Sequence, residues 1–159
     1  TDITLQAEWD AALAAVDATK IALTPLTLDS QEFPSSTTIT VGGDDNTTFD
    51  GAPIIVGETS ITATFIIRDL PIAAYKELKD FTCEIAGGTG VYLLGNNFVI
   101  SDENDSAIKA SSFFIGTPLL GGRTETNNYP ITIVFPAGWW ATAKFNAIST
   151  FNPMDLVNP

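Results

Sequence analysis

The stretch SITATFII, residues 60–67, decides the fold class, because apolar side chains alternate along it with Ser and Thr. Alternation with a period of two is typical of a strand that buries one face. After Pro25 the chain is rich in Thr, Val and Ile, and clusters of Gly, Asn and Asp interrupt it. The predicted strands are 37–41, 54–56, 60–67, 81–85, 90–94, 97–101, 111–115, 130–135 and 142–148. Short strands at this spacing predict an antiparallel β-sandwich or barrel.

Two segments depart from the strand pattern and predict helices. In residues 4–16, Leu5, Trp9, Leu13 and Val16 recur at spacings of three and four, among alanines that favour helix. A shorter helix is expected at 71–79, because a Pro is tolerated in a first turn and apolar residues follow it at helical spacing. The expected fold is therefore mainly β, with an N-terminal helix and one short internal helix.

The chain of 159 residues is long enough for one domain with a substantial core. We expect an N-terminal helical segment at 1–24, a β-sandwich at 25–150 and a C-terminal arm at 151–159. The arm contains two prolines together with Phe151, Met154 and Leu156. Such a segment is expected to form no regular structure of its own and to reach onto a partner.

The glycines of IAGGTGVYLLG, residues 85–95, raise the question of a phosphate-binding loop. A Walker loop ends in Gly-Lys-Ser/Thr, and a dinucleotide loop needs Gly-x-Gly-x-x-Gly before a helix. Here Gly90 is followed by an apolar, β-rich run, and the next glycine is Gly95. We interpret the stretch as a turn between strands.

Charge excludes several classes of partner. The chain carries 19 Asp and Glu against 7 Lys and Arg, which gives a net charge of −12 with no histidine. Such a charge repels nucleic-acid phosphates and anionic lipid, so neither sequence-directed nucleic-acid binding nor a membrane partner is expected. No export signal or long apolar run is apparent, and we expect a chain made in the cytoplasm.

The sequence contains few residues or motifs typical of a catalytic site. It has no histidine, no Gly-x-Ser-x-Gly motif, and a single cysteine, Cys83, with no base to activate it. Two acidic clusters are interpreted as solvated loops rather than calcium sites, because the EF-hand spacing is absent. The clusters are Asp44, Asp45 and Asp50, and Asp102, Glu103 and Asp105. We expect no enzyme, cofactor, metal or small-molecule substrate, although a pair of catalytic carboxylates stays open.

The adjacent Trp139 and Trp140 are the other candidate site. One reading places one indole in the core and the other at a subunit contact. The alternative reading is an exposed indole that stacks on sugar rings, as in a β-sandwich carbohydrate-binding or adhesin module.

Residues 70–116 carry a resemblance to a known family. A short helix and FTCEI (81–85) lead through the glycine turn to VYLLGNNFVI (91–100), then to an acidic loop and ASSFFIG (110–116). This order resembles the tail tube proteins of tailed bacteriophages. The resemblance implies a non-enzymatic virion subunit that forms hexameric rings, whose stacked tube conducts DNA without binding it. It also implies an acidic lumen or rim, for which both acidic clusters are candidates.

Two features lie outside that resemblance, the N-terminal helix and the Trp139–Trp140 segment. They leave open another virion part: a head–tail connector, a tail terminator or a capsid decoration protein. In any such homo-oligomer, strands 60–67 and 130–135 are our candidates for edges that pair with a neighbouring copy, because few lysines protect them.

Overall fold

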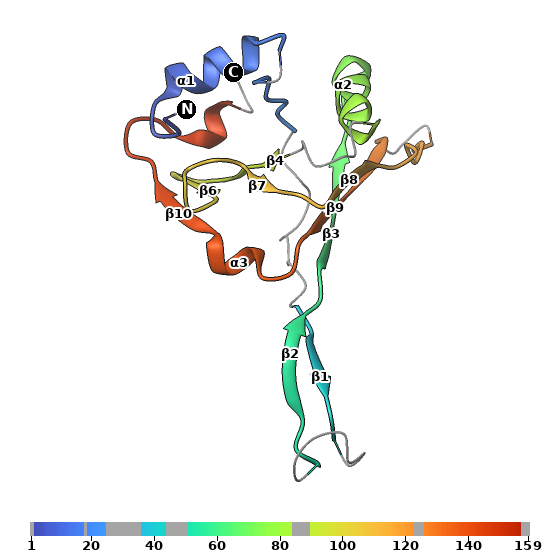
Figure 1. The fold of residues 1–159 in the computed structure, drawn as a ribbon. Coiled ribbons are helices and arrows are strands. Elements are labelled where there is room, and N and C mark those ends of the chain that lie inside the picture. The colour runs from blue at the N-terminus through green and yellow to red at the C-terminus, as the bar shows by residue number, and fades with distance from the viewer. Residues whose placement is uncertain are drawn as a thin grey trace.

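The computed structural model describes residues 2–17, 19–24, 36–43, 51–83, 90–122 and 126–156. Figure 1 shows a body from which a two-stranded hairpin projects. In chain order the elements are α1 (Gln6–Ala14), β1 (Thr38–Val41), β2 (Ile54–Glu58), β3 (Ile61–Arg68), α2 (Ile72–Cys83), β4 (Gly90–Val91), β5 (Leu93–Gly95), β6 (Phe98–Ser101), β7 (Ile108–Lys109), β8 (Ser112–Ile115), β9 (Asn128–Phe135), α3 (Trp139–Thr142), β10 (Lys144–Ala147) and a 3-10 helix, η2 (Pro153–Leu156).

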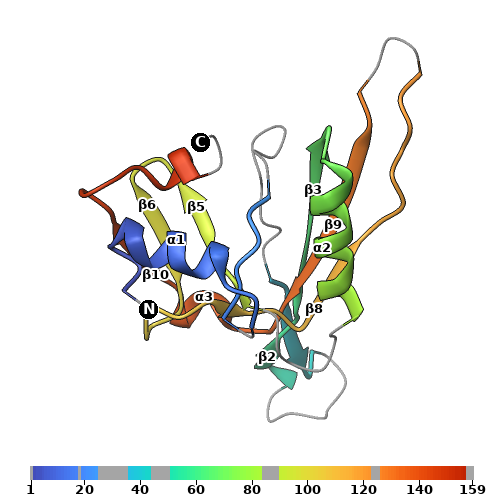
Figure 2. The ribbon, with the colours of Figure 1, turned by 90° about the horizontal axis from the view of Figure 1, so that it is seen from above.

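The predicted fold class is confirmed. The chain is mainly β, its strands pair antiparallel in several small sheets, and both expected helices are present. The described residues form no closed barrel. Figure 2 shows the β10-β6-β5 sheet with α1 on one side of the body, and the β3-β9-β8 sheet with α2 on the other.

The β3-β9-β8 sheet buries one face, as the alternation in residues 60–67 predicts. β3 and β9 pair over their whole length, from Ile61 opposite Phe135 to Arg68 opposite Asn128. Every second residue of β3 is buried and every other one is exposed. The buried residues of the two strands are Ile61, Ala63, Phe65, Ile67, Tyr129, Ile131, Ile133 and Phe135. They form the main core with Leu78 of α2 and Trp139 of α3.

Strand β9 lies in the centre of its sheet, so the prediction that 130–135 forms an edge is wrong. A proline is normally excluded from a central strand, because it donates no hydrogen bond. Here the Pro130 carbonyl accepts a hydrogen bond from Gly116 N (2.7 Å), just after β8 ends at Ile115. The nitrogen of Pro130 faces the same side of β9 as its carbonyl, the side on which β8 lies. Because β8 has ended before this position, no hydrogen bond between β8 and β9 requires an N–H from Pro130.

Helix α2 continues to Cys83. The strand predicted at 81–85 is therefore wrong for residues 81–83. Residues 84 and 85 lie outside the described part. The hydroxyl of Thr82 donates to the Leu78 carbonyl (3.3 Å), one turn earlier, and accepts from Ile115 N of β8 (3.3 Å). The bond to Ile115 ties the last turn of α2 to β8, a contact made only in the folded chain and absent from the local preference of Thr82 for a strand.

A second, smaller core lies under the N-terminal helix. It consists of Ile3, Trp9, Val99 and Ile148, and α1 contributes Trp9, which is 1% exposed. The indole Nε1 of Trp9 donates to the Ile3 carbonyl (3.0 Å). The N-terminal helix therefore packs within its own chain, against β6.

The C-terminal segment folds back on the same core, contrary to the prediction that it forms no regular structure. Pro153 is buried in η2, and Phe151 and Leu156 pack against the second core. The side chain of Asn152 accepts hydrogen bonds from Asn97 N (3.3 Å) and Met154 N (3.1 Å). As far as residue 156, the candidate arm is thus part of the body.

The hairpin β1–β2 is the element that leaves the body, and we call it the stalk (Figure 1). Its base is fixed by a hydrogen bond from Thr59 N to the Thr37 carbonyl (2.9 Å). Every residue of both strands is exposed except Gly57, which is half-buried. The alternation of the main sheet therefore does not extend into the stalk, where neither face is covered by described residues.

Candidate interaction surface

Trp139 and Trp140 occupy different environments in α3. The helix begins after Gly138, whose φ of 71° places it in the left-handed region that favours glycine. Trp139 stacks on Phe135 (ring centroids 4.7 Å apart) and is 4% exposed, whereas Trp140 is 57% exposed. Trp139 is thus the indole in the core and Trp140 the exposed one. Whether Trp140 makes a subunit contact or stacks on a sugar stays a prediction.

Three exposed rings lie together around Trp140. Its ring centroid is 5.6 Å from that of Phe145 on β10, which in turn lies 6.0 Å from Phe98 on β6. Phe145 is 57% exposed and Phe98 37% exposed. We call Phe98, Trp140 and Phe145 the aromatic patch. A contiguous apolar patch of this kind marks an interaction surface more often than an isolated exposed residue does.

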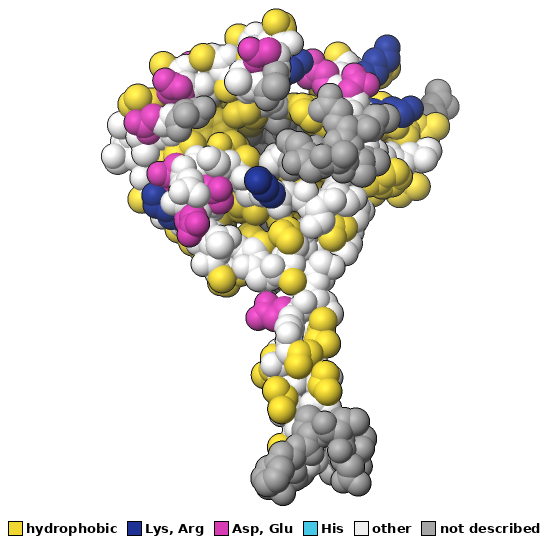
Figure 3. Space-filling model, viewed as in Figure 1, with side chains coloured by type: hydrophobic (Ala, Val, Ile, Leu, Met, Phe, Trp, Pro, Cys, Tyr) yellow, Lys and Arg dark blue, Asp and Glu magenta, His cyan; other side chains and the backbone are white. Residues whose placement is uncertain are grey.

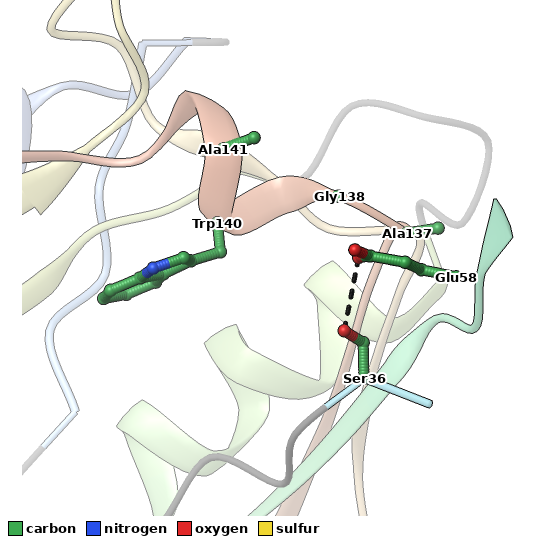
Figure 4. Close-up of a pocket in the computed structure, with 6 residues that line it drawn as sticks. All are labelled: Ser36, Glu58, Ala137, Gly138, Trp140 and Ala141. Carbon is green, nitrogen blue, oxygen red and sulfur yellow. Dashed lines mark hydrogen bonds between the residues drawn. The ribbon is translucent and has the colours of Figure 1, made fainter. Parts of the chain in front are cut away.

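A pocket of about 430 Å³ adjoins the aromatic patch at the base of the stalk (Figure 4). Its described lining consists of Ser36, Glu58, Ala137, Gly138, Trp140 and Ala141. Ser36 Oγ donates to Glu58 Oε2 (3.2 Å), and the indole of Trp140 points away from this pair. Among these lining residues Glu58 is the one titratable group, so they supply no pair of carboxylates for acid–base catalysis.

The acidic loop after β6 is organised by Asp102. Its Oδ1 accepts hydrogen bonds from Asn104 N (2.9 Å) and Ser106 N (2.7 Å). Asp105 forms an ion pair with Lys144 of β10 (2.6 Å). Asp102 and Glu103 also line a second hollow of about 250 Å³, beside Trp139. Asp102 thus fixes the backbone of its own loop, and the described residues contain no cluster that could hold a metal ion.

Replacing Asp102 by alanine is expected to lower the free energy of unfolding by about 1–3 kcal/mol, because two backbone N–H groups lose a charged acceptor. Glu103 is a matched control, because it is exposed in the same loop and its side chain makes no hydrogen bond with any described residue. Glu103→Ala should change the free energy by less than about 0.5 kcal/mol. Urea denaturation of both variants measures the difference, and equal effects would contradict the role of Asp102.

Tyr92 couples this loop to the second core. Its ring meets that of Trp9 edge-on (centroids 5.1 Å apart). Burial raises the pKa of the Tyr92 phenol above its ordinary value, and the Asp102 and Asp105 carboxylates raise it further, whereas a hydrogen bond with the Ala107 backbone lowers it.

A raised phenol pKa makes stability depend on pH in alkaline solution. The unfolded chain releases the Tyr92 proton first, so this contribution is complete below about pH 10 and is lost as pH rises through the folded pKa. We expect Tyr92→Phe to lose less unfolding free energy than the native chain between about pH 9 and about pH 11. Denaturant unfolding at each pH tests this, and parallel curves would contradict it.

Several candidate residues of the sequence lie outside the described part or lack a described side chain. Asp44, Asp45 and Asp50 belong to residues 44–50, and the glycine turn lies mostly within 84–89, neither of which is described. Whether the two acidic clusters come together therefore stays a prediction. Cys83 ends α2, and its side chain is not described.

The stalk is the feature that sequence reasoning missed. Figure 3 shows hydrophobic side chains along it, while acidic side chains are spread over the body on this face. The stalk's large aliphatic residues are 45–65% exposed: Ile39, Val41, Ile54, Ile55 and Val56. The run Ile54–Val56 was the available signal, but an apolar strand is ordinarily assigned to a core.

No helix within the described ranges has the length and apolar character needed to span a bilayer. No protein family, curated protein or solved structure matches the chain.

Proposed function

We propose that this chain is a non-enzymatic structural subunit that assembles with copies of itself. The stalk is the observation that carries the proposal. A two-stranded hairpin is marginally stable in water, and five aliphatic side chains on this one are about half exposed. Such a hairpin is stabilised when a partner covers it.

The outer edge of β3 supports the same proposal. Asp69 N donates to the carbonyl of Asn127, just before β9 (3.0 Å), so the backbone N–H group of Asp69 faces β9. Backbone N–H and C=O groups alternate in direction along a strand. Those that face away from β9 therefore belong to Thr62, Thr64, Ile66 and Arg68. No described strand pairs with this edge. Arg68 is the one charged residue of the eight in β3, and charge is a usual protection of an edge against pairing.

The specific form we propose is a bacteriophage tail tube, in which hexameric rings stack within a virion and DNA passes through the bore. The resemblance of residues 70–116 suggests this form, and the net charge of −12 suits a wall to which DNA does not adhere. A head–tail connector, tail terminator or capsid decoration protein would use the same surfaces. Other virion proteins are then the further partners.

A carbohydrate-binding or adhesin module is the second candidate, because Trp140 is exposed beside Phe145. Two neighbouring rings could stack on a sugar. This candidate requires a monomer whose Trp140 fluorescence changes when a glycan is added.

Negative-stain microscopy with light scattering over protein concentration and salt tests the proposal. We expect rings of fixed symmetry or tubes with an open bore. Assembly should increase with salt, because salt screens the repulsion between copies of net charge −12. A monodisperse monomer at high concentration and high salt would contradict the proposed function.

Thr64→Glu should weaken this assembly at least tenfold, which corresponds to about 1.4 kcal/mol. Thr64 is exposed near the middle of β3, and a carboxylate there adds a like charge where a second acidic copy would pair. Thr64→Gln is the matched neutral control and should assemble nearly as the native chain does. Equal assembly of both variants, measured by light scattering, would show that the β3 edge is not an interface.

A further inference from the structure

We propose that the stalk of one copy lies on the aromatic patch of a second copy and inserts an aliphatic side chain into the pocket beside Trp140. The inference rests on the proposed function, since it names the surface that covers the stalk in the assembly.

The pairing register gives the stalk one aliphatic face. Val41 lies opposite Ile54, and Thr40 opposite Ile55. Because side chains alternate along a strand, Ile39, Val41 and Ile54 share one face. Thr38 and Thr40 share the other face with Ile55, and the register shift leaves Val56 as the bulged residue. The face with three β-branched aliphatic side chains is the one that requires an apolar cover.

The aromatic patch offers such a cover. Phe98, Trp140 and Phe145 present adjoining rings, and the pocket beside them is walled by the small residues Ala137, Gly138 and Ala141. Small walls leave room for a branched side chain, and a volume of about 430 Å³ accommodates one with space to spare.

The stalk's own body cannot supply this cover. The pocket lies at the base of the stalk, where Ser36 and Glu58 form part of its lining. Val41 is five residues beyond Ser36, which in an extended strand is a distance of about 16 Å. A paired hairpin does not bend back over so short a length, so a stalk side chain that enters the pocket comes from another copy.

Charge favours contact at these two surfaces over the rest of the molecule. Copies with a net charge of −12 repel one another, but the strands of the stalk carry no charge before Glu58 at its base. The patch has no charged member, and the nearby Lys144 is already paired with Asp105. The stalk's aliphatic face and the patch therefore carry no charge of their own. The acids nearest to the stalk's aliphatic face in the chain are Glu58, in the pocket lining, and Asp44, Asp45 and Asp50, between β1 and β2.

The area that the stalk and the patch can bury against each other is too small for a stable interface, so this contact must act together with others. Three aromatic rings that are about half exposed offer on the order of 300 Å². With a similar area from the stalk, the total is below the roughly 1,200 Å² of a stable pairwise interface. A closed assembly in which each copy gives one stalk and receives another supplies the additional contacts.

Cross-linking between two single-cysteine proteins tests the inference. In a Cys83→Ser background, one protein carries Ile54→Cys and a size tag, and the other carries Ala141→Cys. After the two are mixed and assembled, a short bismaleimide should give a cross-linked heterodimer at least five times as abundant as in a control. The control replaces Ala141→Cys with Ile72→Cys, on α2, where the native side chain is 73% exposed.

The outcomes separate the inference from the proposed function. Assemblies seen by light scattering, without cross-linking above the control, would overturn stalk docking and leave the proposed function standing. The absence of assembly in the native chain would overturn both. Glycan quenching of a monomer, lost in Trp140→Phe, would assign the patch to carbohydrate and also overturn the inference.

Discussion

Trp9→Ala is expected to lower the free energy of unfolding by about 3–5 kcal/mol, the largest effect of any single substitution proposed for this chain. Trp9 is 1% exposed and fills the second core with Ile3, Val99 and Ile148. Alanine would leave a cavity there and would remove the donor to the Ile3 carbonyl. Urea denaturation followed by circular dichroism measures the loss.

Two further variants show which part of the Trp9 contribution is lost. Trp9→Phe keeps a ring in the core but loses the hydrogen bond to Ile3, and should cost about 1–2 kcal/mol beyond the change in packing. Asp10→Ala, at an exposed position on the same helix, should change stability by less than about 0.5 kcal/mol. A loss of under 1 kcal/mol for Trp9→Ala would mean that α1 does not pack against β6.

The main sheet was predictable because apolar and polar residues alternate in the sequence of its strand β3, and this alternation matches which side chains are buried. Alternating residues of 60–67 are buried on one face of β3, and the observed strand is Ile61–Arg68. A strand with one covered face must place an apolar residue at every second position. The same logic applies to β9, whose residues are also buried alternately, but it did not give the order of the strands, since alternation does not specify neighbours.

The strand predicted at 81–85 failed for a different reason. Local preference was outweighed by contacts made only in the folded chain, in which the Thr82 hydroxyl links α2 to β8. The sequence also left open which of Trp139 and Trp140 is buried. That choice depends on the turn at Gly138, which starts a short helix and directs Trp139 onto Phe135.

The stalk could not be predicted because its sequence does not distinguish burial within a chain from burial between chains. Ile54–Val56 reads as a core strand, yet these residues are 55–65% exposed. If a second copy covers these residues, they are buried in the assembly although they are exposed in the single chain. On this view, the exposed aliphatic run of the stalk and the proposed function have one physical cause.

Replacing the three residues of the stalk's aliphatic face with threonine (Ile39→Thr, Val41→Thr and Ile54→Thr together) should abolish assembly at concentrations where the native chain is fully assembled. Full burial of one such side chain contributes about 1.5–3 kcal/mol, and these are already about half buried. The triple variant therefore loses about 2–4 kcal/mol per contact, which is a thirty- to nearly thousandfold weaker association. Light scattering over a concentration series measures the shift.

The choice of threonine and a control on the opposite face make the result specific to docking. Threonine is β-branched and favours strands, so the hairpin itself should persist. The body's unfolding free energy should not change, because none of the three residues belongs to either core. Ile55→Thr makes the same chemical change on the other face and should weaken assembly less than tenfold. If Ile55→Thr acted as strongly as the triple variant, the two faces of the stalk would be equivalent, and the assignment of one docking face would be wrong.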